Sequence, residues 1–311
     1  MQTHHLILGV FSLLASLSSY AEKTPMQWLK GMEQAHQQLN FKLPLIHLER
    51  DHVQTYAFEH GQVDGEEIVY IASLSGPVRH SYRIDDLVTY VEPETKPYSI
   101  NAKKIVGPSP MKFVGKLEQI KRNYSITALG KGRIAGRICQ LIRLKSKDTH
   151  RFNYILWLDQ QSSVVLRYDL FDLENNLLEQ VQAVGLNISE QPSENLIKLK
   201  NARRIDASAT TPSGEQRWRL SWTPPGYTQQ SRDNHRLMIT AQNVDYMLLS
   251  DGLSDVSIYV AKAGELPLPE KELTKNGISM ANHRQGNVDV TVVGRIPYDT
   301  ALQISRSVKA N

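Results

Sequence analysis

Residues 132–172 contain three consecutive segments in which apolar and polar side chains alternate, and this pattern constrains the fold more than any other feature of the chain. Alternation with a period of two is typical of β-strands that bury one face. The polar segments 147–150 and 159–163 separate the strands and favour turns. We therefore predict an antiparallel meander whose apolar face must be covered, either by the protein's own side chains or by a bound molecule. The apolar positions are Ile138, Ile142 and Leu144, then Phe152, Tyr154, Leu156 and Leu158, then Val164, Leu166, Tyr168 and Leu170.

The first 21 residues have the composition of a secretory signal peptide. A mostly apolar run extends from Leu6 to Leu17 and is too short to span a bilayer. Ser19 and Ala21 then place small residues at the two positions that signal peptidase reads. We predict cleavage before Glu22 and export of a soluble protein.

Cys139 is the only cysteine, so the exported chain cannot form an intramolecular disulfide, a thiolate metal cluster or a lipid-modified N-terminus. We interpret it as a small buried residue of the sheet. The alternative is an intermolecular disulfide through Cys139, so a homodimer stays among the hypotheses.

Positive charge is concentrated in one part of the chain. Residues 103–151 hold 13 Lys and Arg against Glu118 and Asp148, a local balance of +11 in a chain whose net charge is +4. The simpler interpretation is that these Lys and Arg side chains cover outer strand faces exposed to solvent. The more specific one is that they form a surface that binds anionic lipid headgroups. Nucleic acid is the poorest partner, because no recognition motif is present. The candidates for headgroup contacts are Lys103, Lys104, Lys112, Lys116, Arg143 and Lys145.

The remainder of the chain divides into two parts. Thr24 and Gln27 form a capping box that predicts a helix with Trp28, Met32, Ala35 and Leu39 on one stripe. Residues 108–120 have a helical pattern within a series of strands. The polar segment 191–215 predicts a linker between an N-terminal domain (22–190) and a smaller C-terminal domain (216–311). The expected additional strands of the first domain are 41–49, 53–60, 66–73, 78–84, 87–92 and 177–188.

Residues that could perform catalysis form no convincing site. His47 and His52 flank Glu49 and Asp51, but their spacing is not that of a metal-binding helix, and in a strand we expect them to be neighbours along an edge. No Gly-x-Ser-x-Gly motif is present. We therefore predict no catalytic residue, no metal and no cofactor, and we keep an enzyme only as a minority hypothesis.

A binding protein is better supported, because the apolar sheet face and the N-terminal helix could enclose a cavity for an irregular apolar guest. The same residues could equally fill an ordinary core, and periodicity does not separate the two interpretations. The candidates for a lipid pocket are Trp28, Met32, Ile142, Leu144, Phe152, Tyr154, Leu156, Leu166 and Tyr168.

Several short motifs, taken in order, resemble the RseB/MucB family, and the resemblance covers nearly the whole mature chain. In the first domain they are Tyr90-Val-Glu-Pro93 followed by Pro97, Gly132-x-Ile-Ala135 followed by Arg137-x-Cys139-x-x-Ile-Arg143, and Tyr154-Ile-Leu-Trp-Leu-Asp159. In the second they are Ser221-Trp-Thr-Pro224 with Gly226-Tyr227, Ser250-Asp-Gly-Leu253, and Val290-Thr-Val-Val-Gly294 with Pro297 and Thr300-Ala301. The segment 222–227 is shortened relative to the family pattern, which puts the local shape of the second domain in doubt.

The resemblance implies an α+β fold: a curved, incompletely closed antiparallel β-barrel like those of LolA and LppX, covered by helices, plus a smaller C-terminal α/β domain. It also implies a periplasmic negative regulator of the sigma-E envelope stress response. Such a protein binds the periplasmic part of the anti-sigma factor RseA/MucA, shields it from the protease DegS, and releases it on sensing lipopolysaccharide or another acylated ligand. A periplasmic carrier of lipids or lipoproteins is the alternative function.

Overall fold

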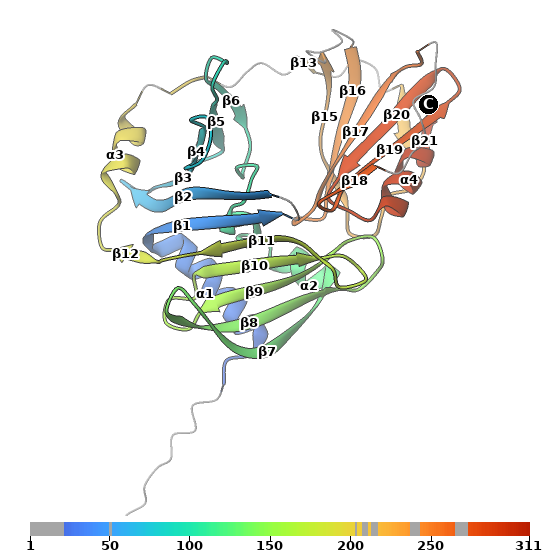
Figure 1. Cartoon of the computed structure of the whole chain (residues 1–311). Coiled ribbons are helices and arrows are strands. Elements are labelled where there is room, and N and C mark those ends of the chain that lie inside the picture. The colour runs from blue at the N-terminus through green and yellow to red at the C-terminus, as the bar shows by residue number, and fades with distance from the viewer. Residues whose placement is uncertain are drawn as a thin grey trace, which may run out of the picture.

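The structure is a computed structural model that describes residues 22–49, 52–202, 204–206, 211–212, 217–236, 243–264 and 273–311. It contains two units, each built on its own antiparallel sheet (Figure 1). The predicted signal peptide lies outside the described residues. Among the helices of the described residues, none combines the length and apolarity needed to cross a membrane.

The first unit is one long sheet in the order β6-β5-β4-β3-β2-β1-β11-β10-β9-β8-β7, and β12 pairs with part of β1. Among the described residues the two end strands do not pair with each other, so the predicted incompletely closed barrel is confirmed. The predicted meander is β8, β9 and β10, which pair in sequence order. The strands are β1 (Asn40–Glu49), β2 (His52–Val63), β3 (Glu66–Ser73), β4 (His80–Ile84), β5 (Leu87–Val91), β6 (Tyr98–Asn101), β7 (Tyr124–Ile134), β8 (Arg137–Ser146), β9 (Asn153–Asp159), β10 (Val165–Phe171), β11 (Leu177–Ala183) and β12 (Asn187–Ser189).

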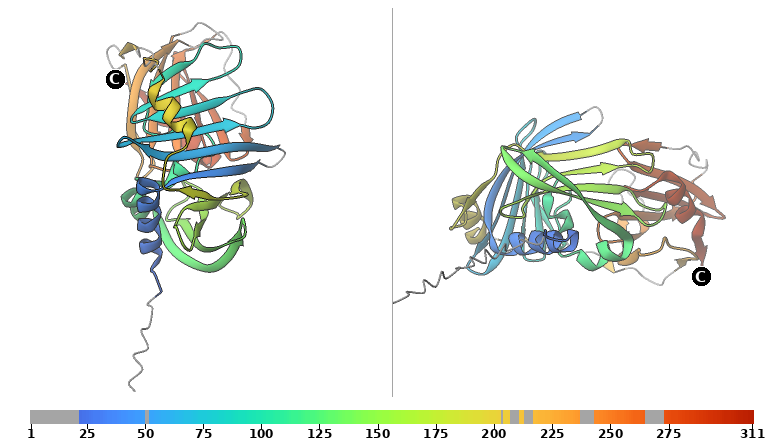
Figure 2. Two further views of the ribbon diagram at one scale, coloured as in Figure 1. Left: turned by 90° about the vertical axis from the view of Figure 1, so that its left-hand side faces the viewer. Right: turned by 90° about the horizontal axis from the view of Figure 1, so that it is seen from below.

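The sheet curls around helix α1 (Pro25–Gln38), as Figure 2 shows from below. The helix begins where the sequence predicts, because the Thr24 side chain accepts from the Gln27 amide and the Gln27 side chain accepts from the Thr24 amide. Trp28 and Met32 are buried on the stripe that faces the sheet. Together with the inner residues of the meander they form one continuous hydrophobic cluster.

The structure differs from several of the sequence-based expectations. Residues 108–120 do not form one helix, because Gly115, with φ +71°, separates the 3₁₀ helix η1 (Pro110–Phe113) from α2 (Leu117–Asn123). Strand β6 was not expected. Ile138 is exposed, because it lies beside the hairpin turn at the rim of the sheet. Part of the predicted linker forms α3 (Glu194–Asn201), which packs Leu196 against the first sheet.

The second unit is a sheet in the order β13-β15-β16-β17-β20-β19-β18, on which helix α4 (Tyr298–Ser307) packs. Ala301 and Ile304 of this helix are buried. A two-stranded sheet joins the Trp218 strand to the C-terminus. The strands are β13 (Thr211–Pro212), β14 (Trp218–Leu220), β15 (Thr228–Arg236), β16 (Asn243–Ser250), β17 (Asp255–Lys262), β18 (Leu273–Lys275), β19 (Ile278–Gln285), β20 (Val288–Gly294) and β21 (Val308–Ala310).

The buried imidazole of His36 makes the first unit sensitive to acid. Burial lowers the pKa of His36 from 6.5 to about 4, although the Met32 carbonyl, 2.8 Å from Nδ1, opposes this shift. Between these values the unfolded chain binds a proton that the folded protein does not, so stability falls as the pH drops. We predict a loss of about 2 kcal/mol of unfolding free energy between pH 7 and pH 5. Urea unfolding at several pH values measures this loss. His36→Phe should reduce the dependence of the unfolding free energy on pH. An unchanged pH dependence in the variant would contradict the role of His36.

Gly132 lies against the indole of Trp157, and this close approach needs a glycine. A Cβ atom at this position would lie 2.2 Å from Cζ3 of the indole. We predict that Gly132→Ala destabilises the protein by about 1–3 kcal/mol through overpacking. At Gly185 the nearest atom would lie 3.8 Å away. The control Gly185→Ala should therefore be neutral or stabilising by up to about 1 kcal/mol in the same thermal unfolding assay.

Candidate functional site at the domain interface

The concave face of the first sheet changes from apolar to charged toward the second unit. Directly paired residues of an antiparallel sheet share a face, and β1 and β11 pair Leu45 with Ala183, His47 with Val181 and Glu49 with Glu179. The apolar pair lies in the hydrophobic cluster, whereas the two carboxylates lie at the end of the strands that meets the second unit (Figure 1). The concave face therefore has an apolar floor and a charged end.

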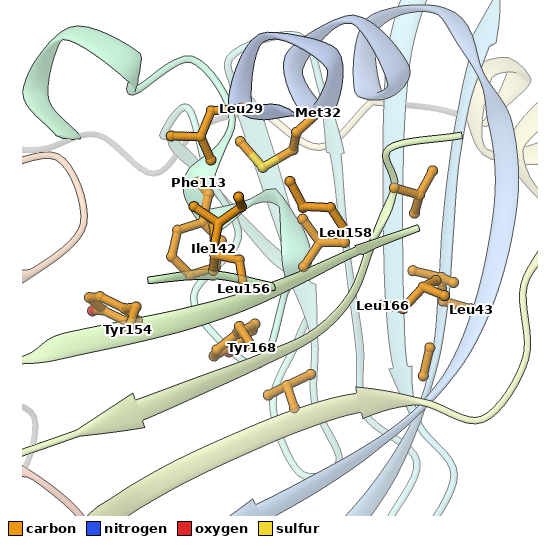
Figure 3. Packing of buried hydrophobic residues seen from close by; sticks show 14 of the residues in the cluster. Leu29, Met32, Leu43, Phe113, Ile142, Tyr154, Leu156, Leu158, Leu166 and Tyr168 are labelled. Atoms are coloured by element: carbon orange, nitrogen blue, oxygen red, sulfur yellow. The ribbon is translucent and has the colours of Figure 1, made fainter. Parts of the chain in front are cut away.

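Helix η1 covers the floor next to this charged end (Figure 3). Phe113 is fully buried, and its ring packs edge-on against Tyr154 and Tyr168 with centroid distances of 5.4 and 5.3 Å. The ammonium of Lys112 lies over the same two tyrosine rings and 3.8 Å from Glu179. Burial lowers the pKa of Lys112, and Glu179 opposes this effect. The two side chains fix η1 through an apolar and an ionic contact.

The nine candidates for a lipid pocket are brought together by the fold, and all of them are buried in the hydrophobic cluster. Tyr154 also borders the cleft between the units. Phe152 lies close to the backbone of Gly277, in the hairpin that joins β18 and β19. The structure thus packs these side chains against one another and against Phe113, and lipid binding stays a prediction.

The charged end is neutralised by the second unit. The guanidinium of Arg295 lies 3.0 Å from Glu49 and also binds Glu179. His47 Nε2 lies 3.0 Å from Glu179 Oε1 and 3.7 Å from Glu49 Oε1. Burial opposes ionisation of Glu179, yet Lys112, His47 and Arg295 hold its pKa far below 4.5. Of the four residues expected along one strand edge, His47 and Glu49 share a face of β1, where β11 adds Glu179. His52 begins β2, and Asp51 lies outside the described residues.

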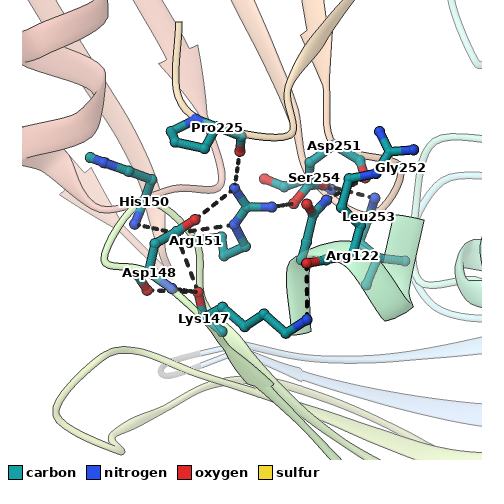
Figure 4. Close-up of polar contacts among 12 residues, drawn as sticks. Arg122, Lys147, Asp148, His150, Arg151, Pro225, Asp251, Gly252, Leu253 and Ser254 are labelled. Carbon is teal, nitrogen blue, oxygen red and sulfur yellow. Dashed lines mark hydrogen bonds and ion pairs between the residues drawn. The ribbon is translucent and has the colours of Figure 1, made fainter. Parts of the chain in front are cut away.

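A second buried ion pair joins the units beside α2 (Figure 4). Arg151 Nη1 donates to Asp251 Oδ2 at 3.0 Å, and both side chains are fully buried. The same guanidinium donates to the Pro225 carbonyl and to Asp148. Asp251 also accepts from the backbone amides of Leu253 and Ser254, although burial raises its pKa. The network fixes the turn 251–254 of the second unit onto the first.

An open cleft of about 480 Å³ lies beside the Arg295 network and is lined by both units. Its walls include the cations Lys104, Lys112 and Arg295 and the carboxylates of Glu49 and Glu179. It adjoins a groove of about 520 Å³ along β2–β4, with which it shares Tyr56 and the segment 106–108. We call this space the interdomain cleft.

The six candidates for headgroup contacts do not form one surface. Lys104 and Lys112 line the interdomain cleft, where Lys104 Nζ lies 2.7 Å from Asp255. Lys116 is half-buried, and its alkyl chain lies near Gly252. Lys103 is exposed. Arg143 and Lys145 are exposed on the outer face of β8, opposite Ile142 and Leu144. The concentration of positive charge is thus divided between the interface and a solvated strand.

Four residues that hold the interface were not predicted as site residues: Arg151, Glu179, Asp251 and Arg295. Arg151 and Asp251 are 100 positions apart, and Glu179 and Arg295 are 116 apart, so no local sequence pattern could have found these pairs.

Comparison with known proteins gives a consistent result over both units. The family model for the MucB/RseB N-terminal domain matches residues 24–207, and that for the MucB/RseB C-terminal domain matches residues 212–309. The sigma-E factor regulatory protein RseB of Escherichia coli is 28% identical over 304 residues, which cover 96% of this chain and 94% of RseB. The sigma factor AlgU regulatory protein MucB of Pseudomonas aeruginosa is 24% identical over 318 residues, covering 99% and 98%.

Two solved structures of MucB have the same fold. MucB in the Pseudomonas aeruginosa MucA/MucB complex aligns with a TM-score of 0.74 at 21% identity, covering 92% of this chain and 99% of the other. MucB in complex with MucA(peri) aligns with a TM-score of 0.71 at 22% identity, covering 91% and 98%.

Removing one partner of the Arg151–Asp251 ion pair should destabilise the protein strongly. Arg151→Met leaves the Asp251 carboxylate buried without its cation, and we predict a loss of about 3–5 kcal/mol in unfolding free energy. The control is Lys198→Met, since Lys198 and Glu194 form an exposed pair on α3 and its loss should cost at most about 0.5 kcal/mol. Urea unfolding followed by tryptophan fluorescence measures both. Equal effects of the two substitutions would contradict the importance of the buried pair.

Proposed function

The chain belongs to the MucB/RseB family, and we propose from this premise that it binds the periplasmic segment of an anti-sigma factor and shields it from proteolysis. The observation that carries the proposal is that both family models match in order and together cover the two units. Relatives with this arrangement are named regulators of sigma factors, and MucB has been solved together with MucA. The protein is then a periplasmic regulator of an envelope stress response.

We assign partner binding chiefly to the second unit (residues 216–311) and to the adjoining interdomain cleft. The cleft is open, and it offers charges of both signs beside apolar side chains such as Ile278, which is 41% exposed. A peptide segment could use such a surface for ionic and apolar contacts at once. Because both units line the cleft, binding there depends on how the units dock.

We further propose that an acylated ligand such as lipopolysaccharide releases the partner by entering the apolar floor of the first sheet. Phe113 fills the space between Tyr154 and Tyr168, but it belongs to a single 3₁₀ turn with glycines of positive φ on either side, Gly107 and Gly115. Displacement of this turn would expose the tyrosines. About ten buried methylenes would contribute about 8 kcal/mol, against a binding cost of about 4–15 kcal/mol. The resulting affinity would be moderate and the exchange reversible.

The two binding events must oppose each other. If an acylated ligand weakens partner binding, the partner weakens ligand binding by the same factor. Lys112 provides a physical route, because it lies on η1 and pairs with Glu179, which in turn binds Arg295 of the second unit. Movement of η1 would thus disturb the interface.

Co-elution of residues 22–311 with the periplasmic segment of MucA or RseA tests this function. We expect a complex on size-exclusion chromatography that lipopolysaccharide dissociates. Phe113→Ala should lower the lipopolysaccharide concentration needed by about tenfold or more, since truncation frees the volume that an acyl chain would need. The matched control is Phe58→Ala, which removes an equally buried ring elsewhere in the same cluster.

Absence of a complex would contradict the proposed partner. A complex that persists while the protein binds lipopolysaccharide would contradict the release mechanism alone. Transfer of lipid to an acceptor membrane without any effect on proteolysis of the anti-sigma factor would instead favour a carrier.

A further inference from the structure

His47, Glu49 and Glu179, hereafter the carboxylate cluster, combine three metal-ligating side chains on one face of the sheet. One ligand atom from each lies within 4.8 Å of the others. His47 Nε2 lies 3.0 Å from Glu179 Oε1 and 3.7 Å from Glu49 Oε1. A tetrahedral Zn²⁺ with bonds of about 2.0–2.1 Å places its ligands about 3.3–3.4 Å apart. The two observed separations lie on either side of this value, so small side-chain movements would form the site.

The backbone fixes this arrangement independently of the side-chain rotamers. Glu49 and Glu179 are directly opposite in the register of β1 and β11, and His47 is two residues from Glu49 on the same face. Like charges in directly opposed positions destabilise a sheet unless a cation lies between them. The cluster therefore requires positive charge, and in the docked arrangement Arg295 of the second unit supplies it.

The surroundings favour an ion that keeps a bound water. The cluster borders the open interdomain cleft, which gives it a path to solvent. The buried hydroxyl of Tyr168 lies next to Glu179. Water on an ion at Glu179 would bring a hydrogen-bonding group toward this hydroxyl. Three protein ligands and one water are typical of an open zinc site.

We propose that the carboxylate cluster is a Zn²⁺ site that competes with Arg295 for Oε1 of Glu49. The Oε1 atom of Glu49 now faces Arg295 at 3.0 Å, and it must turn to the ion for the site to form. Oε2 of Glu179 can keep its contact with Lys112, 3.8 Å away, which would orient the ligand. Because Arg295 already binds Oε1 of Glu49, the oxygen that the ion needs, zinc binding and docking of Arg295 exclude each other.

The competition couples the ion to the arrangement of the two units. Arg295 and Asn276, which donates to Glu49 Oε2 at 3.1 Å, connect the second unit to the cluster. An ion on the cluster removes the Arg295 contact and favours the undocked arrangement. The apparent zinc affinity of the intact protein is then reduced by the fraction of molecules in which Arg295 is bound. Removing Arg295 should reveal the full affinity.

Calorimetric titration of ZnCl₂ into the mature chain tests the proposal, with Co²⁺ absorption as the readout of tetrahedral coordination. We expect Arg295→Ala to bind one Zn²⁺ at least tenfold more tightly than the unsubstituted chain and to give the visible bands of tetrahedral Co²⁺. Glu179→Gln or Glu49→Gln, each added separately to Arg295→Ala, should abolish both the calorimetric zinc binding and the visible Co²⁺ bands. Circular dichroism verifies that each variant is folded. His80→Ala, which removes a histidine outside the cluster, should leave the affinity unchanged.

Three outcomes would overturn the proposal. They are an equal affinity with and without Arg295, retention of binding in both glutamine variants, and loss of binding in His80→Ala. These titrations need no anti-sigma segment, so their failure would leave the proposed function untouched.

Discussion

Two carboxylates directly opposite each other on neighbouring strands cannot both remain ionised in a half-closed interior unless a cation lies between them. Glu49 and Glu179 create this requirement at the end of β1 and β11, and Arg295 meets it from the other unit. The electrostatic balance of the first sheet therefore depends on docking of the second. Lys112 contributes to the same balance from η1, so the covering of the concave face is tied to the interface as well.

The two units keep largely separate hydrophobic cores and meet through buried ionic contacts. The first core takes in Leu253 from the second unit, while the second core is built from its own sheet and α4. Arg151 and Asp251 anchor one side of the interface, and Arg295 anchors the other. Buried pairs of this kind contribute orientation more than net attraction, because desolvation offsets much of their energy. The interface is therefore suited to being remade when a partner or ligand changes one charge.

The sequence predicted those parts of the fold that depend on local pattern. The meander, its inner residues apart from Ile138, and the start of α1 follow from alternation and capping, and the structure confirms them. The division of residues 108–120 at Gly115 was not predicted, since a helical pattern does not report a residue with positive φ. The candidate site was predicted least well. Glu49 meets Glu179 only through the pairing of two strands distant in sequence, and Arg151 meets Asp251 only through docking of two units.

Most strands of the first sheet pair with a neighbour in sequence, but β1 also pairs with β11, where Leu45 meets Ala183. Non-local pairing costs more loop-closure entropy and forms slowly. In a chain that leaves a translocation channel N-terminus first, one edge of β1 would stay unpaired until β11 emerges. The hairpins on either side could form earlier, and the closure that brings the two opposed carboxylates together would be among the last steps of folding. The pairing of Glu49 with Glu179 would then form only after the whole first sheet has been made.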